Sequence, residues 1–378
     1  MPGGAGRHRW RGLALYGVDG TTLRVADTPA NRAHCGEQVA GGGRGVSAYP
    51  LVRVVALMAR RAHLLAAVEV GPSVTSEARA AAALWPRVPD ASLTVVDRNF
   101  RAAGTLLPLA AGGAERHWRV RAKSNTRTVL VEQLGAGDAR VELEGSDHAR
   151  RADPARPRTW RARGPGAPAD LARPRTWRAR AITYERPGGG GPQRLLTSLR
   201  APARDPARDP ARDPARDPAR DPARDPARDP ARDPAAEIVA LYHERWELEL
   251  GYDELQPELL EREAALRSQS PAAVTQERWG VLLAYNLVRL EMSRVADAAA
   301  VAPTRIRFVG ALRLIRDEWL WSTYAAPGAI PRHLARRRDA LARLVLPERR
   351  SERVYPRAVK RKMSNYPRKR LPPPPEPK

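Results

Sequence analysis

Residues 237–256 have the regular spacing of hydrophobic and polar positions that is typical of a helix. At about 100° per residue, one stripe of apolar side chains points in a single direction, as a core-facing helix requires; it comprises Ile238, Leu241, Leu248, Tyr252, Leu255 and Leu259. A second, polar stripe lies beside it and comprises Tyr242, Arg245, Glu249 and Gln256. We predict one continuous amphipathic helix. Taken alone, such a polar stripe is more often a solvated flank with ion pairs between residues four apart.

The first hundred residues change to the short apolar runs that are typical of strands. The predicted order is a strand in 10–25, strands in 49–58 and 63–70 that form an antiparallel hairpin, a helix in 76–85 and a short strand in 92–96. The first strand is predicted to end at Asp19 in VDGTT, and the last runs into Asp97 in VVDRNF. In an open sheet of this order the first and fourth strands can lie parallel and adjacent. Asp19 and Asp97 are then expected to lie together.

This order of strands is the ribonuclease H-like arrangement, so the predicted fold class is α/β (α+β), a mixed sheet with helices. Two adjacent carboxylates repel each other unless they share a proton or hold a cation. A hard divalent ion such as Mg²⁺, which prefers oxygen ligands, is the natural resolution. Either aspartate alone is more often a turn residue at a strand end. Together with a glutamate on a later helix, they indicate a metal site.

Short strand candidates separated by Gly- and Asp-rich turns predict a β-rich insertion before the helix described first. Within it the sequence ARPRTWRAR occurs twice, at 155–163 and 172–180. Its tryptophans, Trp160 and Trp177, could stack on nucleic-acid bases while the flanking arginines contact phosphates. Alternatively, the extra copy is a looped-out insertion, and the sequence leaves both possibilities open.

The tetrapeptide ARDP is repeated eight times in residues 203–234. Proline at every fourth position prevents a helix or a central strand, so we predict a solvated linker. The predicted organisation is a first part of the ribonuclease H-like core in 1–109, the insertion in 110–192, a last core strand in 193–200, the linker in 201–236, the 237–256 helix with C-terminal core helices in 237–330 and a basic tail in 331–378.

The composition limits the possible partners. A formal net charge of +24 favours a polyanion, with nucleic acid the leading candidate. Residues 331–378 carry 16 Lys and Arg against 4 Asp and Glu, which suits phosphate contacts, although a basic tail can also serve only solubility. The apolar runs are too short to span a membrane, and the N-terminus has no secretory signal. With Cys35 as the single cysteine, no intrachain disulfide can form, so we expect a cytoplasmic protein.

Three motifs together resemble a bacterial insertion-sequence DDE transposase. They are Asp19 in VDGTT, Asp97 in VVDRNF, and the spacing Tyr242-x2-Arg245-x3-Glu249. The last motif is similar to the group with a Tyr-Arg-Glu-Lys signature and a β-rich insertion. Segments such as RVADTPANRAH and LLAYNLVRLEM are similar to the actinobacterial branch of that group.

The resemblance implies that Asp19, Asp97 and Glu249 bind two Mg²⁺ ions, for which Mn²⁺ can substitute. The implied reaction is metal-dependent phosphodiester cleavage and strand transfer. Tyr242 and Arg245 are expected to hold DNA phosphate, and Trp246 to stack on a displaced base. The full set of expected DNA-binding residues is Tyr242, Arg245, Trp246, Gln256, Arg98, Trp160, Trp177, Arg357, Lys360 and Arg368.

The implied partners are double-stranded DNA at the terminal inverted repeats and target DNA. The resemblance also implies a homodimer in the synaptic complex and association with the nucleoid, away from any membrane.

Two departures from the family pattern bear on activity. Gln256 stands where the signature has lysine, and Pro257 should end or kink the helix. The chain also begins 18 residues before Asp19, so we expect it to lack the N-terminal end-binding domain of the family. We therefore expect the fold and metal site to persist in a truncated or degenerate copy whose transposition is in question. The alternatives are a catalytically silent DNA-binding remnant and a metal-dependent nuclease without strand transfer.

Overall fold

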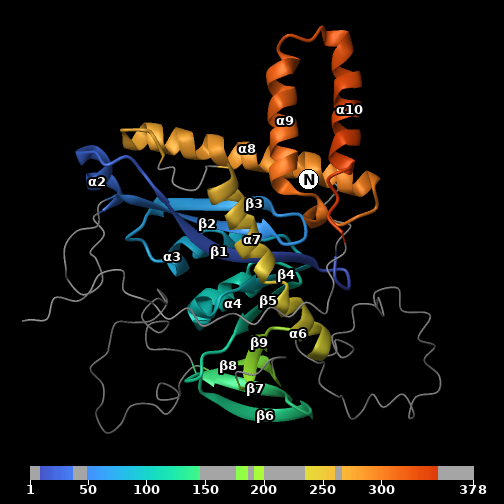
Figure 1. Ribbon diagram of the computed structural model, residues 1–378. Helices are drawn as coiled ribbons and strands as arrows, with labels where there is room; N and C mark the ends of the chain where they lie inside the picture. The colour runs from blue at the N-terminus through green and yellow to red at the C-terminus, as the bar shows by residue number, and fades with distance from the viewer. Residues whose placement is uncertain are drawn as a thin grey trace, which may run out of the picture. The chain divides into compact units, whose positions relative to one another are not determined.

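The computed structural model describes residues 9–36, 49–144, 176–185, 191–199, 235–259 and 266–347. The strands of this part of the chain form a single nine-stranded sheet in the order β3-β2-β1-β4-β5-β9-β8-β7-β6 (Figure 1). Their bounds are β1 Ala14–Arg24, β2 Leu51–Ala59, β3 Leu64–Pro72, β4 Ser92–Val96, β5 Arg116–Arg121, β6 Thr128–Gly135, β7 Asp138–Glu144, β8 Thr176–Tyr184 and β9 Gln193–Thr197.

The helices pack against this sheet or against one another and, with the sheet, belong to one compact unit, Met1–Val345. Their bounds are α2 Pro29–Cys35, α3 Glu77–Ala82, α4 Ala103–Ala111, α6 Ala235–His243, α7 Trp246–Asp253, α8 Pro271–Ala298, α9 Phe308–Ser322 and α10 Ile330–Ala342. Short 3-10 turns occupy Trp85–Arg87, Arg98–Phe100, Pro303–Arg305 and Pro327–Ala329, and a π-helical turn occupies Glu254–Leu259. No described helix is both long enough and apolar enough to cross a membrane.

The pairing of the first strands confirms the predicted ribonuclease H-like mixed sheet. β1 pairs antiparallel with β2, and β2 pairs antiparallel with β3, so the predicted hairpin is confirmed. β4 lies parallel to β1, with Val18 opposite Val96. Asp19 and Asp97 each directly follow one of these paired valines, so the two aspartates lie next to each other at the same height along their strands.

The prediction that the first strand ends at Asp19 is wrong. β1 continues to Arg24 because β2 offers a longer partner, and Asp19 itself lies opposite Ala56. The shorter β4 stops pairing at Val18. Asp19 is therefore a mid-strand residue at the point where β1 loses its partner on one side.

The core sheet also includes a strand from the region that we assigned to the insertion. β5 pairs parallel with β4, and β9 then pairs antiparallel with β5, so residues 116–121 belong to the central sheet. Strands β8, β7 and β6 continue the same sheet beyond β9 by antiparallel pairing. Trp118 on β5 and Trp177 on β8 meet edge to face, with ring centroids 5.2 Å apart, which joins the two parts.

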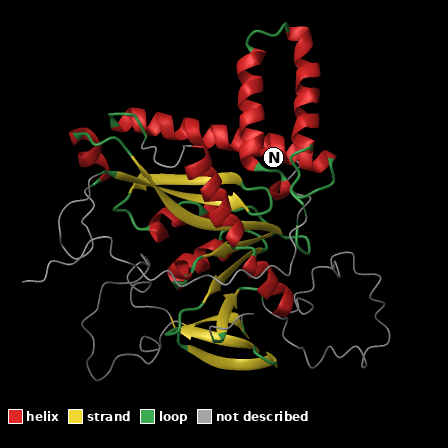
Figure 2. Cartoon of the chain, in the orientation of Figure 1, coloured by secondary structure: helices red, strands yellow, loops and turns green. Residues whose placement is uncertain are grey.

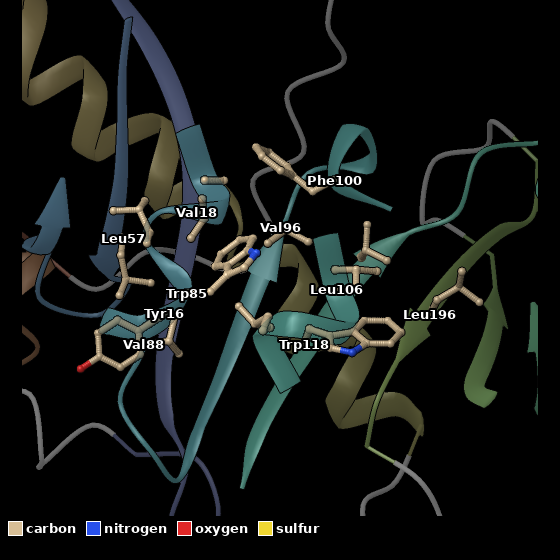
Figure 3. Packing of buried hydrophobic residues seen from close by; sticks show 14 of the residues in the cluster. Tyr16, Val18, Leu57, Trp85, Val88, Val96, Phe100, Leu106, Trp118 and Leu196 are labelled. Atoms are coloured by element: carbon tan, nitrogen blue, oxygen red, sulfur yellow. The ribbon is translucent and has the colours of Figure 1, made fainter. Parts of the chain in front are cut away.

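Both faces of the central strands are buried, as expected for a sheet with helices on each side (Figure 2). Successive residues of β2 alternate between two cores: Val55 and Leu57 face the core that includes α3 and α4, while Val54 and Met58 face the core that includes α7 and α8. Figure 3 shows part of the first core, in which Trp85 lies beside Val18 and Val96.

The prediction of one continuous helix over 237–256 is wrong, although most of its predicted apolar stripe is buried. The segment consists of α6, α7 and the π-helical turn. Between α6 and α7 the amide of Arg245 donates to the carbonyl of Tyr242, three residues back, at 3.0 Å. The carbonyl four residues back, that of Leu241, accepts instead from the buried side chain of Arg60.

The regular α-helical pattern of this segment ends at Asp253, and Pro257 lies within the π-helical turn that follows. Proline has no amide hydrogen to donate, which is consistent with a change of hydrogen-bond pattern at this point. The predicted kink near Pro257 is therefore present as a π-helical turn.

Part of the predicted basic tail is also folded. α10 pairs with α9, and the buried Arg337 of α10 donates to the carboxylate of Glu291 on α8 at 2.5 Å. The predicted tail residues Arg357, Lys360 and Arg368 lie outside the described residues, as does Trp160.

Candidate active site

A pocket of about 330 Å³ opens beside the C-terminal end of β4. It is lined by Asp19, Asp97, Arg98, Arg121, Tyr242 and Arg245. Asp19 comes from β1, Asp97 and Arg98 from the turn after β4, and Arg121 from the end of β5. Tyr242 comes from the last turn of α6, and Arg245 from the break between α6 and α7. The structure thus brings together five of the residues that the sequence singled out and adds Arg121.

Asp19 is the most perturbed acid of this pocket. Its pKa is raised from 3.8 to about 6, mainly by burial and in addition by the nearby carboxylates of Glu77 and Asp97. The Gly20 amide opposes this shift by donating to Asp19 Oδ1 at 2.9 Å. Arg245 also opposes it, with Nη1 3.9 Å from Asp19 Oδ2. The raised pKa of Asp19 therefore comes mainly from its burial beside two other carboxylates, in a pocket that Arg98, Arg121 and Arg245 also line.

Glu249 is connected to Asp19 by the side chain of Arg245, which contacts both carboxylates. Arg245 Nη2 lies 2.5 Å from Glu249 Oε1, one helical turn along, while its Nη1 faces Asp19. The helix is fixed to β1 by Tyr252, whose hydroxyl donates to the main-chain oxygen of Asp19 at 2.6 Å. Arg245 consequently links the two carboxylates that the resemblance assigns to one metal site.

Glu77, the first residue of α3, is an acid of this site that the sequence reasoning missed. Its carboxylate lies so close to Gly20 that a Cβ at position 20 would collide with Glu77 Oε1. Burial raises the pKa of Glu77, Asp97 raises it further, and Arg53 opposes the shift. An acid in the first turn of a helix is usual and gives no signal by itself. The glycine directly after Asp19 was the one sequence feature that could have indicated a close approach.

The donor set suits a hard divalent cation in part. Asp19 and Asp97 offer carboxylate oxygens at one pocket, and their repulsion contributes to the raised pKa of Asp19. Glu249 is engaged by Arg245. Within the described ranges, no three His, Cys, Asp or Glu residues converge on a common point that could hold a metal ion. The two aspartates are therefore the residues that fit a divalent cation, and the side chain of Arg245 lies between them and Glu249.

The other expected DNA-binding residues are distributed differently. Tyr242 is 8% exposed, and burial raises the pKa of its hydroxyl. Trp246 is 45% exposed, and Arg98 is exposed at the pocket. Trp177 is buried in the core against Trp118, so the structure gives it a packing role and leaves its stacking on a base without support. For Gln256 only the backbone is described.

Comparison with known proteins gives consistent matches. Residues 12–287 match the family described as "Transposase DDE domain". The transposase InsG for insertion sequence element IS4 of Escherichia coli (strain K12) is 31% identical over 359 residues, which cover 95% of this chain and 70% of that protein. Among solved structures, the cryo-EM structure of a piggyBac transposase synaptic complex with hairpin DNA has a TM-score of 0.41 and 11% identity, covering 89% of this chain and 58% of that one.

Proposed function

This chain belongs to the transposase DDE domain family, and we propose that it catalyses metal-dependent phosphodiester cleavage and strand transfer at the ends of an insertion sequence. The observation that carries the proposal is the parallel pairing of β1 and β4, which brings Asp19 and Asp97 to one pocket beside Tyr242 and Arg245. Within the family, the spacing of Tyr242, Arg245 and Glu249 supports assignment to the Tyr-Arg-Glu-Lys group, and the further sequence similarity supports its actinobacterial branch.

In this proposal Asp19, Asp97 and Glu249 hold two Mg²⁺ or Mn²⁺ ions. When bound, such ions activate the attacking oxygen and stabilise the leaving oxygen of an in-line displacement at phosphorus. Glu249 would have to part from Arg245 to join the two aspartates. The freed guanidinium would then be available to a DNA phosphate, for which its planar fork is well suited.

The proposed partner is double-stranded DNA, at the terminal inverted repeats and at the target, bound by a homodimer. The net charge of +24 and the guanidinium groups of Arg98 and Arg121 at the pocket support a polyanionic substrate. In this proposal Trp246, at the start of α7, stacks on a base displaced from the duplex, and its 45% exposed side chain supports this role.

The test is a cleavage and joining assay on a labelled duplex that carries the terminal inverted repeat of the element. Wild-type protein should nick this duplex with Mg²⁺ or Mn²⁺ and join the new end to a target plasmid. Asp97→Asn and Glu249→Gln should each lower the cleavage rate at least about 100-fold while duplex affinity is retained. Asp253→Asn, an exposed acid on the same helix as Glu249, is the matched control and should cleave normally. Equal cleavage by Asp97→Asn and wild type would refute the proposed site.

Two other outcomes correspond to other functions. Cleavage without joining would make the protein a metal-dependent nuclease. Tight duplex binding with no cleavage in either metal would make it a silent DNA-binding remnant. The contact between Arg245 and Glu249 favours the second of these, because it occupies the proposed third ligand.

A further inference from the structure

We infer that Arg60 and Arg119 are positioning residues for the pocket, because they bind the backbone of α6 and set the break that places Arg245 and Glu249. This inference rests on the proposed function for its catalytic consequence, but its structural part can be tested without it.

Both arginines are fully buried, which is unusual for a charged side chain. Arg60 lies in the turn between β2 and β3, and Arg119 lies on β5 in the centre of the sheet. Burial lowers the pKa of Arg60 to about 10, so this guanidinium remains charged at neutral pH. Burial, and then the neighbouring Arg60, hold the pKa of Arg119 well below its usual value. Each side chain brings guanidinium hydrogen-bond donors into the core beneath α6.

The acceptors of these donors are main-chain oxygens of α6 and, for Arg60, also the carboxylate of Glu244, whose Oε2 lies 3.3 Å from Arg60 Nη2. Arg60 Nη2 donates to the carbonyl of Leu241 at 2.8 Å, and Arg119 Nη1 donates to the carbonyl of Ile238. In an uninterrupted α-helix the carbonyl of Leu241 would accept from the amide of Arg245, four residues on. That amide donates instead to Tyr242, three residues back.

The change of pattern continues for one turn. The amide of Glu247 donates to Glu244 and that of Leu248 donates to Arg245, both at 3.0 Å and both across three residues. Such tighter turns reorient a helix and often mark a functional position. α6 therefore ends at His243, and α7 starts anew at Trp246.

The two helices are held on the sheet by different means. α7 is seated by close packing, since Gly17 on β1 leaves room for Leu248 and Gly251 lies against Met58 of β2. α6 packs Ile238 and Leu241 against the sheet and is bound in addition by the two arginines: Arg119 also lies under the ring of Tyr242, with its guanidinium carbon 5.8 Å from the ring centroid. Because α6 and α7 are held at different places on the sheet, the position of Tyr242 relative to Arg245 and Glu249 is fixed.

A purely stabilising role accounts poorly for these arginines. Arg60 Nε and Nη1 and Arg119 Nε and Nη2 are buried and have no hydrogen-bond partner among the described residues. Buried charges with unsatisfied donors cost free energy, and apolar residues of similar volume often replace them without loss of stability. Their presence is better explained by the geometry that they impose on α6.

The test uses the full chain with Arg60→Met and Arg119→Met, because methionine keeps much of the volume and removes the donors. We expect the unfolding temperature to stay within about 5 °C of wild type. Hydrogen–deuterium exchange in peptides covering 238–249 should change at least about threefold as the turn rearranges. DNA cleavage should fall at least about tenfold with duplex affinity unchanged, because a displacement of about 1 Å at a reacting group is enough for such a loss.

Two further variants separate positioning from general effects. Arg60→Lys retains a donor that can reach the Leu241 carbonyl and should restore much of the wild-type exchange pattern and cleavage. Arg278→Met removes another buried arginine, on α8, and should leave exchange in 238–249 unchanged. Unchanged exchange in the Arg60 and Arg119 variants, or failure of Arg60→Lys to differ from Arg60→Met, would overturn the inference. Absence of cleavage by wild type would count against the proposed function alone, since exchange would still report the break.

Discussion

The segment α6–α7 and the helix α8 both carry apolar residues at helical spacing, yet only α8 is continuous. α8 runs unbroken for 28 residues. The α6–α7 segment is interrupted after His243, where the side chain of Arg60 takes a backbone acceptor. Apolar spacing therefore indicates which face of a helix is buried, but it says nothing about donors that arrive from elsewhere in the chain.

The same two regions differ in how much of their apolar surface is covered. In α8 the residues Leu282, Tyr285 and Val288 are buried, whereas Trp279, Leu283 and Leu287 are 43%, 61% and 48% exposed. Of the four residues Trp279, Leu282, Leu283 and Leu287, which recur at helical spacing, only Leu282 is buried. Four measurements would sharpen or break this comparison.

The largest effect is expected at Tyr285, the fully buried residue through which α8 reaches the π-helical turn. Its hydroxyl lies 3.1 Å from Glu254 Oε2, so Tyr285→Ala removes both a large side chain and this hydrogen bond. We expect the free energy of unfolding to fall by about 3–5 kcal/mol, as for other large aromatic truncations. Urea denaturation measures this directly. A loss below about 1 kcal/mol would mean that α8 is not a principal support of the fold.

The next effect concerns Asp19, to which α7 is tied through Tyr252. Its pKa is raised from 3.8 to about 6 in the folded protein. The folded state therefore holds this proton more tightly than the unfolded state. The stabilisation is complete below about pH 4 and is lost as the pH rises through 6, for a total of about 3 kcal/mol. Asp19→Asn should remove this contribution to the pH dependence and be more stable than wild type at pH 7.5.

The control for Asp19 is the effect of a divalent ion. Added Mg²⁺ should raise the unfolding temperature of wild type at pH 7.5 and have less effect on Asp19→Asn, because a ligand that binds only the folded state stabilises it. If both proteins show the same pH slope, the charge of Asp19 is not a source of instability.

Replacing one glycine by alanine in each region should have a smaller effect on the free energy of unfolding, with opposite signs in α7 and α8. In α7 a Cβ at Gly251 would lie 2.6 Å from Met58 Sδ, whereas in α8 nothing lies within 4 Å of a Cβ at Gly280. Gly280→Ala should stabilise the protein by about 0.5–1 kcal/mol through helix propensity. Gly251→Ala should forfeit that gain and lose about 1 kcal/mol, since overpacking displaces Met58. Equal gains at both sites would show that α7 is not seated as closely as described.

The smallest effect is expected on the exposed stripe of α8. Leu283→Gln should change the free energy of unfolding by no more than about 0.5 kcal/mol, because the side chain is already in solvent. Leu282→Gln, its buried neighbour, is the contrasting variant and should be strongly destabilising. A large loss from Leu283→Gln would show that this stripe is covered in the folded protein.

The features that could be predicted from the sequence are those set by residues close together in the chain. The hairpin β2–β3, the strand β4 and the neighbouring positions of Asp19 and Asp97 follow from runs of apolar residues and their order. The break at α6–α7 depends on Arg60, far away in the sequence, and could not be read from the helix itself. The membership of β5 in the core sheet likewise depends on strand pairing, which apolar runs alone do not fix.

The contact between Gly20 and Glu77 has a consequence for the history of the sequence. Because the carboxylate of Glu77 occupies the space that a side chain at position 20 would need, a residue larger than glycine at position 20 forces the Glu77 side chain to move. A shorter residue at position 77 meets no such conflict and makes room at position 20. In related chains positions 20 and 77 are therefore expected to covary. Such covariation would indicate that selection acts on the start of α3 together with Asp19 and Gly20.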